Sequence, residues 1–135
     1  MHVLAVLAYK EGEPVTSELL ACSVNTNPVV IRRLLLILQE AGLVETRKGA
    51  GLGSRLSRPA EKIDLAEVYR AVESEDLFVL PAREPNPECP VGHCIQTALE
   101  TIFASAQRAM EQELARTTLA DVVRAIEETC FKTKD

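Results

Sequence analysis

The chain has 135 residues, of which 47% are hydrophobic and only 4% aromatic, and it contains no tryptophan. This length allows one domain, or one small domain with an extended element that needs a partner, and it excludes two separate cores. The high aliphatic content favours packed helices over a β-sandwich. No apolar run is long enough to span a bilayer and none is typical of a signal peptide, so we expect a cytoplasmic protein without membrane contact. Its four cysteines are then expected to be reduced, reactive or metal-binding.

The formal net charge of −5 hides an asymmetry between the two halves of the chain. Residues 1–62 hold eight Lys and Arg against six Asp and Glu, a net charge of +2, whereas residues 63–135 hold seven against fourteen, a net charge of −7. Five of the positive residues lie between Arg47 and Lys62, where Glu61 is the only acidic residue. Nucleic acid would therefore meet the N-terminal half, and the acidic half would be held away from it.

Two short helices are predicted at the start of the chain. The apolar spacing of His2 to Tyr9 is helical, but no capping residue precedes it, which suggests a late start site or a few missing N-terminal residues. A second helix is expected over Ser17 to Cys22, with Leu19 and Leu20 facing inward and Cys22 packed near the core.

A third helix has the clearest boundaries. Asn27 is a typical N-cap, and Pro28 suits the first helical position, where no N–H is needed. Apolar residues then recur at spacings of three and four until Gly42, a C-terminal stop: Ile31, Leu34, Leu35, Leu38 and Ala41. The other side carries Arg32 and Arg33, which suit a helix that points its N-terminal half at phosphates and base edges. The alternative is a solvated basic pair on an ordinary amphipathic helix.

The stretch from Val44 to Arg58 predicts a β-hairpin. Two short polar-alternating runs flank a glycine-rich centre, and glycines allow a tight turn with positive φ angles. A phosphate-binding loop of an NTPase would instead need Gly-Lys-Ser/Thr opening a helix. The charged residues of the hairpin besides Glu45 are Arg47, Lys48, Arg55 and Arg58. Helix, short turn, helix and hairpin together predict a winged helix-turn-helix.

The middle of the chain predicts a helix and a connector. Asp64 is a candidate N-cap for a helix over Leu65 to Glu73, and Glu67 would complete a capping box. From Ser74 to Glu88 the prolines are too dense for a helix interior.

A long helix is predicted from Pro90 to about Arg116. Its apolar residues recur with near-heptad spacing: Val91, Ile95, Ala98, Leu99, Ile102, Ala106, Ala109, Met110 and Leu114. A rod of about 40 Å outreaches so small a domain, so we expect it to pack on a second copy of the chain. The alternative, which can coexist, is a hairpin onto a last helix over Leu119 to Glu128, capped by Thr117 or Thr118.

With these elements in place, the chain resembles the bacterial IscR, NsrR and CymR type of winged helix-turn-helix transcriptional regulators, the Rrf2 family. The resemblance rests on the helix-turn-helix, the wing KGAGLGSRLSRP, the helix DLAEVYRAVE, the cysteine-containing connector, the long helix, and TLADVVRAI. It implies a mainly α fold with a two-stranded wing and a long C-terminal dimerisation helix. It also implies a homodimer that reads a palindromic operator whose half-sites lie roughly one helical turn apart.

The resemblance also assigns site residues and a division of the chain. Recognition-helix contacts correspond to Asn27, Val29, Val30, Arg32 and Arg33, and wing contacts to Thr46, Lys48 and Gly49. Arg55 adds a further cation to the wing. The wing departs from the family pattern of consecutive glycines followed by an aromatic residue, because Leu52 interrupts the glycines and Ser54 replaces the ring. We divide the chain into a DNA-binding region (1–62), a helix and connector (63–88), and a sensor segment with dimerisation helices (89–135).

The segment ECPVGHC is the candidate sensor. Relatives that carry a [2Fe-2S] cluster use three cysteines here, whereas this chain offers only Cys89 and Cys94, with His93 as a conceivable third ligand. The ligand count disfavours a cluster. Thiol chemistry fits better, because Cys89 would lie at the N-cap of the long helix, where unpaired N–H groups and the helix dipole favour a thiolate. An intact helix separates the two cysteines by about 7.5 Å along its axis, so a disulfide would require the first turn to unwind.

Three other interpretations stay open. Cys94 can be a small core residue and Cys89 only a cap, since buried free cysteine is common. The regulator can also lack a sensor. The competing class is a thiol oxidoreductase using both cysteines, which their spacing and the absence of thioredoxin-like alternation or an acid–base constellation disfavour, so we expect no catalytic residues.

Overall fold

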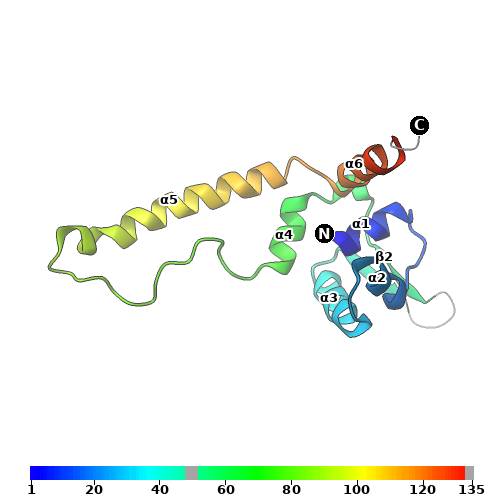
Figure 1. Ribbon diagram of the computed structural model, residues 1–135, viewed down its shortest axis with the longest axis horizontal. Helices are drawn as coiled ribbons and strands as arrows, with labels where there is room; N and C mark the ends of the chain where they lie inside the picture. Colours follow the sequence, from blue (N-terminus) through cyan, green and yellow to red (C-terminus); the bar gives the residue numbers. More distant parts are fainter. Residues whose placement is uncertain (48–51, 133–135) are drawn as a thin grey trace.

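The computed structural model describes residues 1–47 and 52–132, and it is mainly helical as predicted. Its elements are α1 (His2–Tyr9), α2 (Ser17–Val24), α3 (Pro28–Glu40), β1 (Val44–Arg47), β2 (Gly53–Leu56), the 3-10 helix η1 (Ala60–Lys62), α4 (Leu65–Val72), α5 (Pro90–Leu114) and α6 (Leu119–Phe131). The head consists of α1, α2, α3, β1, β2, η1 and α6. An arm made of α5 and the connector 73–89 projects from it (Figure 1). α4 lies at the base of the arm.

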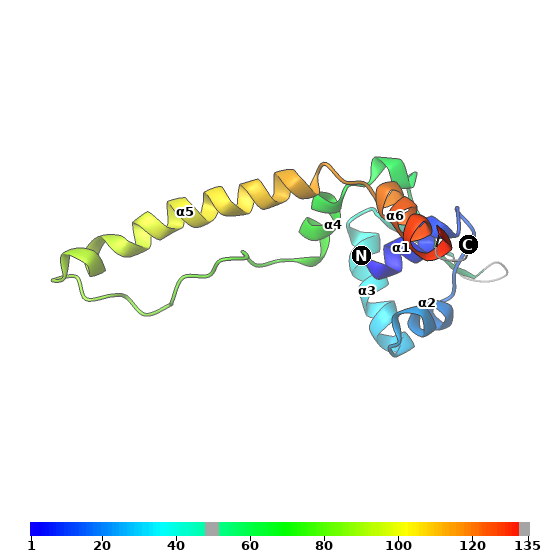
Figure 2. The same cartoon turned by 45° about the horizontal axis from the view of Figure 1, so that its top comes forward.

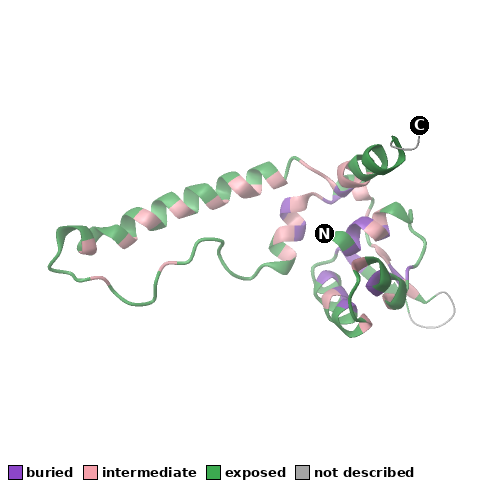
Figure 3. Ribbon diagram, viewed as in Figure 1, coloured by how far each residue is buried: buried purple, intermediate pink, exposed green. Residues whose placement is uncertain are grey.

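The core lies in the head and at α4. Figure 3 shows the buried residues gathered there and none along the arm. The predicted stripe of α3 is largely confirmed, because Ile31, Leu35 and Leu38 are buried and Leu34 packs against the same cluster. Ala41 is exposed because it is already the C-cap. Fully buried side chains come from most elements of the head: Leu4, Leu7, Leu20, Ile31, Leu38, Leu43, Ile63, Val68 and Leu119.

Two predictions about α2 are wrong. Leu19 is exposed, and Cys22 is exposed rather than packed. The helix has only eight residues and turns a single narrow face to the core, which Leu20 and Ala21 occupy. Leu19 precedes these two residues and Cys22 follows them, so both side chains point to solvent.

The last helix packs on the head and does not form a hairpin with α5. α6 lies against α1 and η1, which both views place side by side (Figures 1 and 2). Thr118 caps α6 through a complete capping box with Asp121. The backbone N–H of Thr118 donates to the Asp121 carboxylate. The pKa of that carboxyl group is lowered, and this hydrogen bond is the main cause. Asp121 is thus held ionised where it stabilises the helix start.

The base of the arm is closed by backbone hydrogen bonds. Asp64 and Thr118 form an isolated antiparallel bridge, in which Leu65 N donates to Thr117 O and Leu119 N donates to Ile63 O, both at 2.9 Å. Asp64 caps α4 as predicted, at 2.8 Å from the Glu67 amide nitrogen. The Glu67 carboxylate, however, accepts from Arg58 instead of completing a capping box. The arm therefore leaves the head and returns to it at one point.

The connector runs beside α5 and touches it near both ends. Leu77 N donates to Gln107 Oε1 at 3.2 Å, and the rings of Phe78 and Phe103 stack with centroids 4.9 Å apart. At the other end Asn86 O accepts from Cys89 N at 3.3 Å. α5 has no buried residue along its 25 positions. In this structure the arm therefore has one long helix without a buried residue, against which α4 and the connector pack.

Candidate nucleic-acid interface

A tight turn positions α3 against α2. Asn25, with a left-handed φ of 62°, ends α2, and the side chain of Asn27 accepts from Val29 N at 2.8 Å to start α3. The pair is bent by 107°, within the range of about 90–120° typical of a helix-turn-helix. Within residues 1–47 and 52–132 no single helix is long and apolar enough to span a bilayer, and only this bent pair together reaches that length.

The outward face of α3 combines apolar and basic side chains. Because Ile31, Leu35 and Leu38 face the core, helical geometry turns Val29, Arg33 and Leu36 directly away from it. Val29 is 54% exposed, Val30 51%, Leu36 62% and Ile37 41%. Arg32 and Arg33 are exposed as well. The structure thus exposes four of the predicted contact residues on α3, beside the capping residue Asn27: Val29, Val30, Arg32 and Arg33.

The two arginines of α3 differ in their surroundings. Arg32 Nη2 lies 2.8 Å from Glu18 Oε1 on α2, so an ion pair ties the two helices of the motif together. Both groups are exposed, so the pair contributes little to stability, about 0–1 kcal/mol. Arg33 has no ion pair within the described part of the chain. Its guanidinium group is therefore the more available cation of the two.

The wing is an antiparallel hairpin in the register Val44–Leu56, Glu45–Arg55, Thr46–Ser54 and Arg47–Gly53. Arg55 Nε lies 2.5 Å from Glu45 Oε1 across the two strands. Thr46 is exposed, and its hydroxyl lies 3.0 Å from that of Ser54. The predicted contacts Lys48 and Gly49 lie outside the described residues. The wing thus presents Arg47, Thr46 and the carboxylate-paired Arg55.

The segment before α2 fastens the wing to the head. Val15 N donates to Ser54 O at 2.9 Å, and Ser54 N donates to Val15 O at 2.8 Å. Ser54, which stands where the family pattern has an aromatic residue, is buried in this contact. Gly53 has a φ of 150°, and a Cβ there would lie 2.8 Å from Val15 N. Both the conformation and the close approach require glycine.

Replacing Gly53 with alanine should destabilise the protein by about 1–3 kcal/mol, because the new methyl group strains the backbone and displaces Val15. The free energy of unfolding in urea measures this loss. Gly12→Ala is the matched control, since Gly12 also has a positive φ, 88°, but a Cβ there meets nothing within 4 Å. Equal losses in the two variants would show that the contact with Val15 contributes nothing.

The cysteine segment begins the arm. All four cysteines are free and exposed. Cys89 is the N-cap of α5, as predicted, and its side chain makes no capping hydrogen bond. Cys94 is exposed on the same helix, so within a single chain it is not a core residue. His93 is exposed beside it.

The cysteine segment does not fit the kind of iron–sulfur cluster that some relatives carry. Such clusters need four ligands, mostly cysteine thiolates. Within the described residues no group of three or more His, Cys, Asp or Glu side chains is placed to hold a metal ion. Cys89, Cys94 and His93 therefore form no ready-made ligand set.

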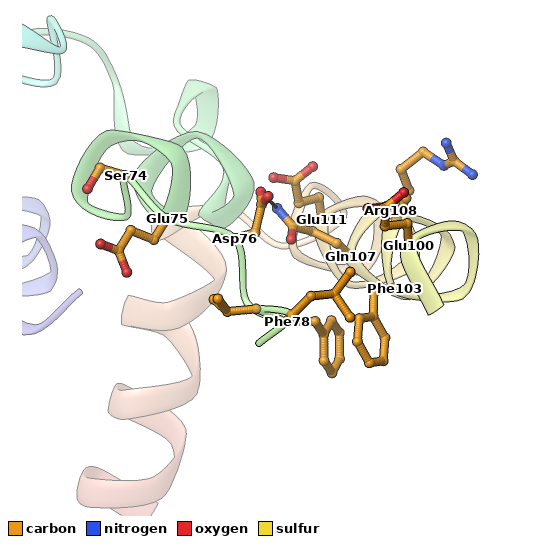
Figure 4. A pocket seen from close by; sticks show the side chains of 12 residues that line it. Ser74, Glu75, Asp76, Phe78, Glu100, Phe103, Gln107, Arg108 and Glu111 are labelled. Atoms are coloured by element: carbon orange, nitrogen blue, oxygen red, sulfur yellow. Dashed lines mark hydrogen bonds between the residues drawn. The ribbon is translucent and has the colours of Figure 1, made fainter. Parts of the chain in front are cut away.

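A cavity of about 770 Å³ opens between the connector and α5. In Figure 4 the stacked rings of Phe78 and Phe103 lie on one side of it, and Asp76 and Gln107 lie close together on another. Gln107 Nε2 lies 3.4 Å from Asp76 Oδ1. These contacts hold the connector to α5, and none of the predicted site residues lines the cavity.

The bent helix pair, the exposed arginines and the fastened hairpin define a winged helix-turn-helix DNA-binding protein. The family model described as "Rrf2: Iron-dependent Transcriptional regulator" matches residues 1–125, and the chain belongs to this family of transcriptional regulators. The resemblance stated from the sequence is thereby confirmed. The thiol oxidoreductase is excluded, because the family consists of regulators and not enzymes.

Named relatives agree with the family match. The chain is 44% identical over 123 residues to YwnA of Bacillus subtilis, named as an HTH-type transcriptional regulator, covering 91% of this chain and 90% of that protein. Two solved structures share the fold. IscR of T. potens has a TM-score of 0.71 at 23% identity, covering 96% of this chain and 83% of its own. CymR, the global cysteine regulator of B. subtilis, has a TM-score of 0.69 at 24% identity, covering 92% and 89%.

Two features of the interface were missed from the sequence. Glu18 and Glu45 each pair with a predicted DNA-contacting arginine. The alternation of the wing strands could have indicated Glu45 opposite Arg55, since cross-strand neighbours share a face. Glu18 lies 14 residues from Arg32 on another helix, and no local pattern links them.

Proposed function

We propose that this transcriptional regulator binds a palindromic operator as a homodimer and represses transcription. The observation that carries the proposal is the uncovered apolar face of α5. Val91 and Ile102 are strongly exposed there, and the helix contains no buried residue. An apolar stripe of this length on a monomer would be costly to leave in water.

A second copy of the chain is the partner that this face fits best. α5 is about 38 Å long at 1.5 Å per residue, and its apolar residues follow a near-heptad spacing. Two such helices crossing along their stripes would bury both faces at once and give a symmetric pair of heads. Two-fold symmetry in the protein is matched by a palindrome in the DNA.

Each head would place α3 in the major groove and the wing on the backbone. The proposed groove contacts are Val29, Val30, Arg32 and Arg33, with Asn27 at the helix start. The proposed wing contacts are Thr46, Arg55 and the segment that includes Lys48 and Gly49. Glu18 and Glu45 would orient Arg32 and Arg55 before DNA arrives, in the way that fixed carboxylates limit side-chain freedom.

A footprint on the promoter of the chain's own gene, combined with sedimentation, tests the proposal. We expect protection of two half-sites about one helical turn apart and two chains for each protected duplex. Protection of a single half-site by one chain would contradict it. Transcription from that promoter in vitro should fall when the protein is added, and an increase would contradict repression.

We further propose that Cys89 and Cys94 couple DNA binding to thiol oxidation. Both sulfurs are exposed, so a peroxide can reach them. A disulfide forms when the two thiols give up two electrons and two protons, while the peroxide is reduced to water. A Cβ added at Gly92 would collide with Asn86 O, so the connector packs closely on the first turn of α5. Because the disulfide requires that turn to unwind, oxidation would alter the start of the arm.

Replacing Cys89 with serine should make operator binding insensitive to peroxide, while the affinity of the reduced protein stays within about twofold of wild type. The serine keeps the size of the cap but cannot form a disulfide. Gel shifts with and without peroxide measure the effect. Cys22→Ser, at an exposed cysteine on α2, is the control and should respond like wild type. Unchanged sensitivity in Cys89→Ser would remove this cysteine from the switch.

A further inference from the structure

The first turn of α3 offers apolar groups where a DNA-reading helix commonly has polar ones. Pro28 has no N–H, Ile31 is buried, and the side-chain oxygen of Asn27 is occupied by its cap. The groove-facing side chains of that turn are therefore Val29 and Val30, both more than half exposed. A valine cannot exchange hydrogen bonds with a base edge.

The major groove displays one apolar group, the C5 methyl of thymine. A valine at the centre of a groove-facing surface can gain free energy only by covering such a methyl group. Arg33 follows Val29 by four residues, so the two side chains are neighbours on the helix surface. An arginine beside the valine can bind the edge of a guanine, or a phosphate, in the same base-pair step.

We infer that Val29 reads the C5 methyl of a thymine in each half-site and is a specificity-determining residue of this regulator. The inference rests on the proposed binding of α3 in the major groove. It adds that part of the operator sequence is recognised by apolar contact and not by hydrogen bonds.

A protein segment covering the same face fits the structure less well. Such a segment would have to bury Arg33, which has no ion pair in the described part of the chain. Burying an unpaired guanidinium group carries a large desolvation cost. DNA supplies the opposite charge and the apolar group within the same groove, so it satisfies both side chains.

Replacing thymine with deoxyuracil tests the inference, since this removes the methyl group and keeps every hydrogen-bonding atom. We expect one thymine position in each half-site where wild-type affinity falls about fourfold, and about fifteenfold when both half-sites are changed. Val29→Ala, which changes both chains of the proposed dimer, should bind the thymine operator about fifteenfold more weakly and should lose the response to deoxyuracil at that position. Fluorescence anisotropy with both duplexes and both proteins gives the four affinities needed.

Two controls separate the inference from other causes. Alanine is the better helix former, so weaker binding by Val29→Ala cannot come from a less stable α3. Val79→Ala changes another strongly exposed valine, in the connector, and should bind both duplexes like wild type. A wild-type protein indifferent to deoxyuracil, or a Val29→Ala variant that keeps the response, would overturn the inference. Absence of any preferred duplex would instead contradict the proposed function.

Discussion

Replacing Arg32 and Arg33 together with alanine should weaken operator binding by about a thousandfold or more and leave the dimer intact. Each arginine that contacts DNA contributes about 1–3 kcal/mol, and the proposed dimer carries four of them. Both side chains are exposed on α3, which lies in the head and not on the arm, so their loss should not disturb association of the chains. Gel shifts on the promoter and sedimentation of the free protein measure the two outcomes.

The two single variants should differ. Arg33 has no ion pair within the described residues, whereas the Glu18 carboxylate already neutralises part of the charge of Arg32. We therefore expect Arg33→Ala to lose more affinity than Arg32→Ala. A double replacement of Arg83 and Arg108, both on the arm, removes the same charge and should bind nearly like wild type. Retention of operator binding by the α3 double variant would show that another surface reads the DNA.

The second large effect is expected at the centre of α5. Ile102→Asp should convert the proposed dimer into monomers at micromolar concentration, because two-fold symmetry would place a carboxylate from each chain in the buried seam. Operator affinity should fall by several orders of magnitude, since each head would then bind a half-site alone. Sedimentation velocity gives the mass, and circular dichroism checks that the helix persists.

Thr97→Asp is the matched control for that variant. Thr97 is also exposed on α5 but lies on nearly the opposite side of the helix from Ile102. The substitution introduces the same residue into the same helix and should leave the dimer and its operator affinity unchanged. If Ile102→Asp remained dimeric while folded, the apolar face of α5 would not be the interface.

Local rules predicted the elements of the head well. The boundaries of α3 follow from neighbouring residues, because Asn27 caps the helix and Pro28 occupies its first position. The cap of α6, Thr118, is one of the two predicted candidates, whereas the capping box that it forms with Asp121 was not predicted. Such signals lie within one turn of chain, but tertiary contacts can override them: the capping box predicted for α4 does not form, because the Glu67 carboxylate accepts from Arg58.

Relations between distant segments could not be predicted in the same way. Val15 pairs with Ser54, and α6 packs on α1 instead of α5. Neither contact could be predicted, because no sequence pattern links the residues that make it. The exposure of Leu19 and Cys22 likewise depends on which narrow face of a short helix meets the core. Periodicity says that a helix has an apolar side, but the tertiary packing decides how wide that side is.

The backbone bridge between Asp64 and Thr118 brings the two ends of residues 65–117 together, and beyond α4, which adds Val68 to the core, the connector and α5 form an insertion into the head. Lengthening the connector and α5 together by one helical turn would extend that insertion by about 5.4 Å and leave the residues of α3 and the wing in place. In the proposed dimer, the distance between the two halves of the proposed palindrome, about 3.4 Å for each base pair, can therefore change separately from the bases that are read.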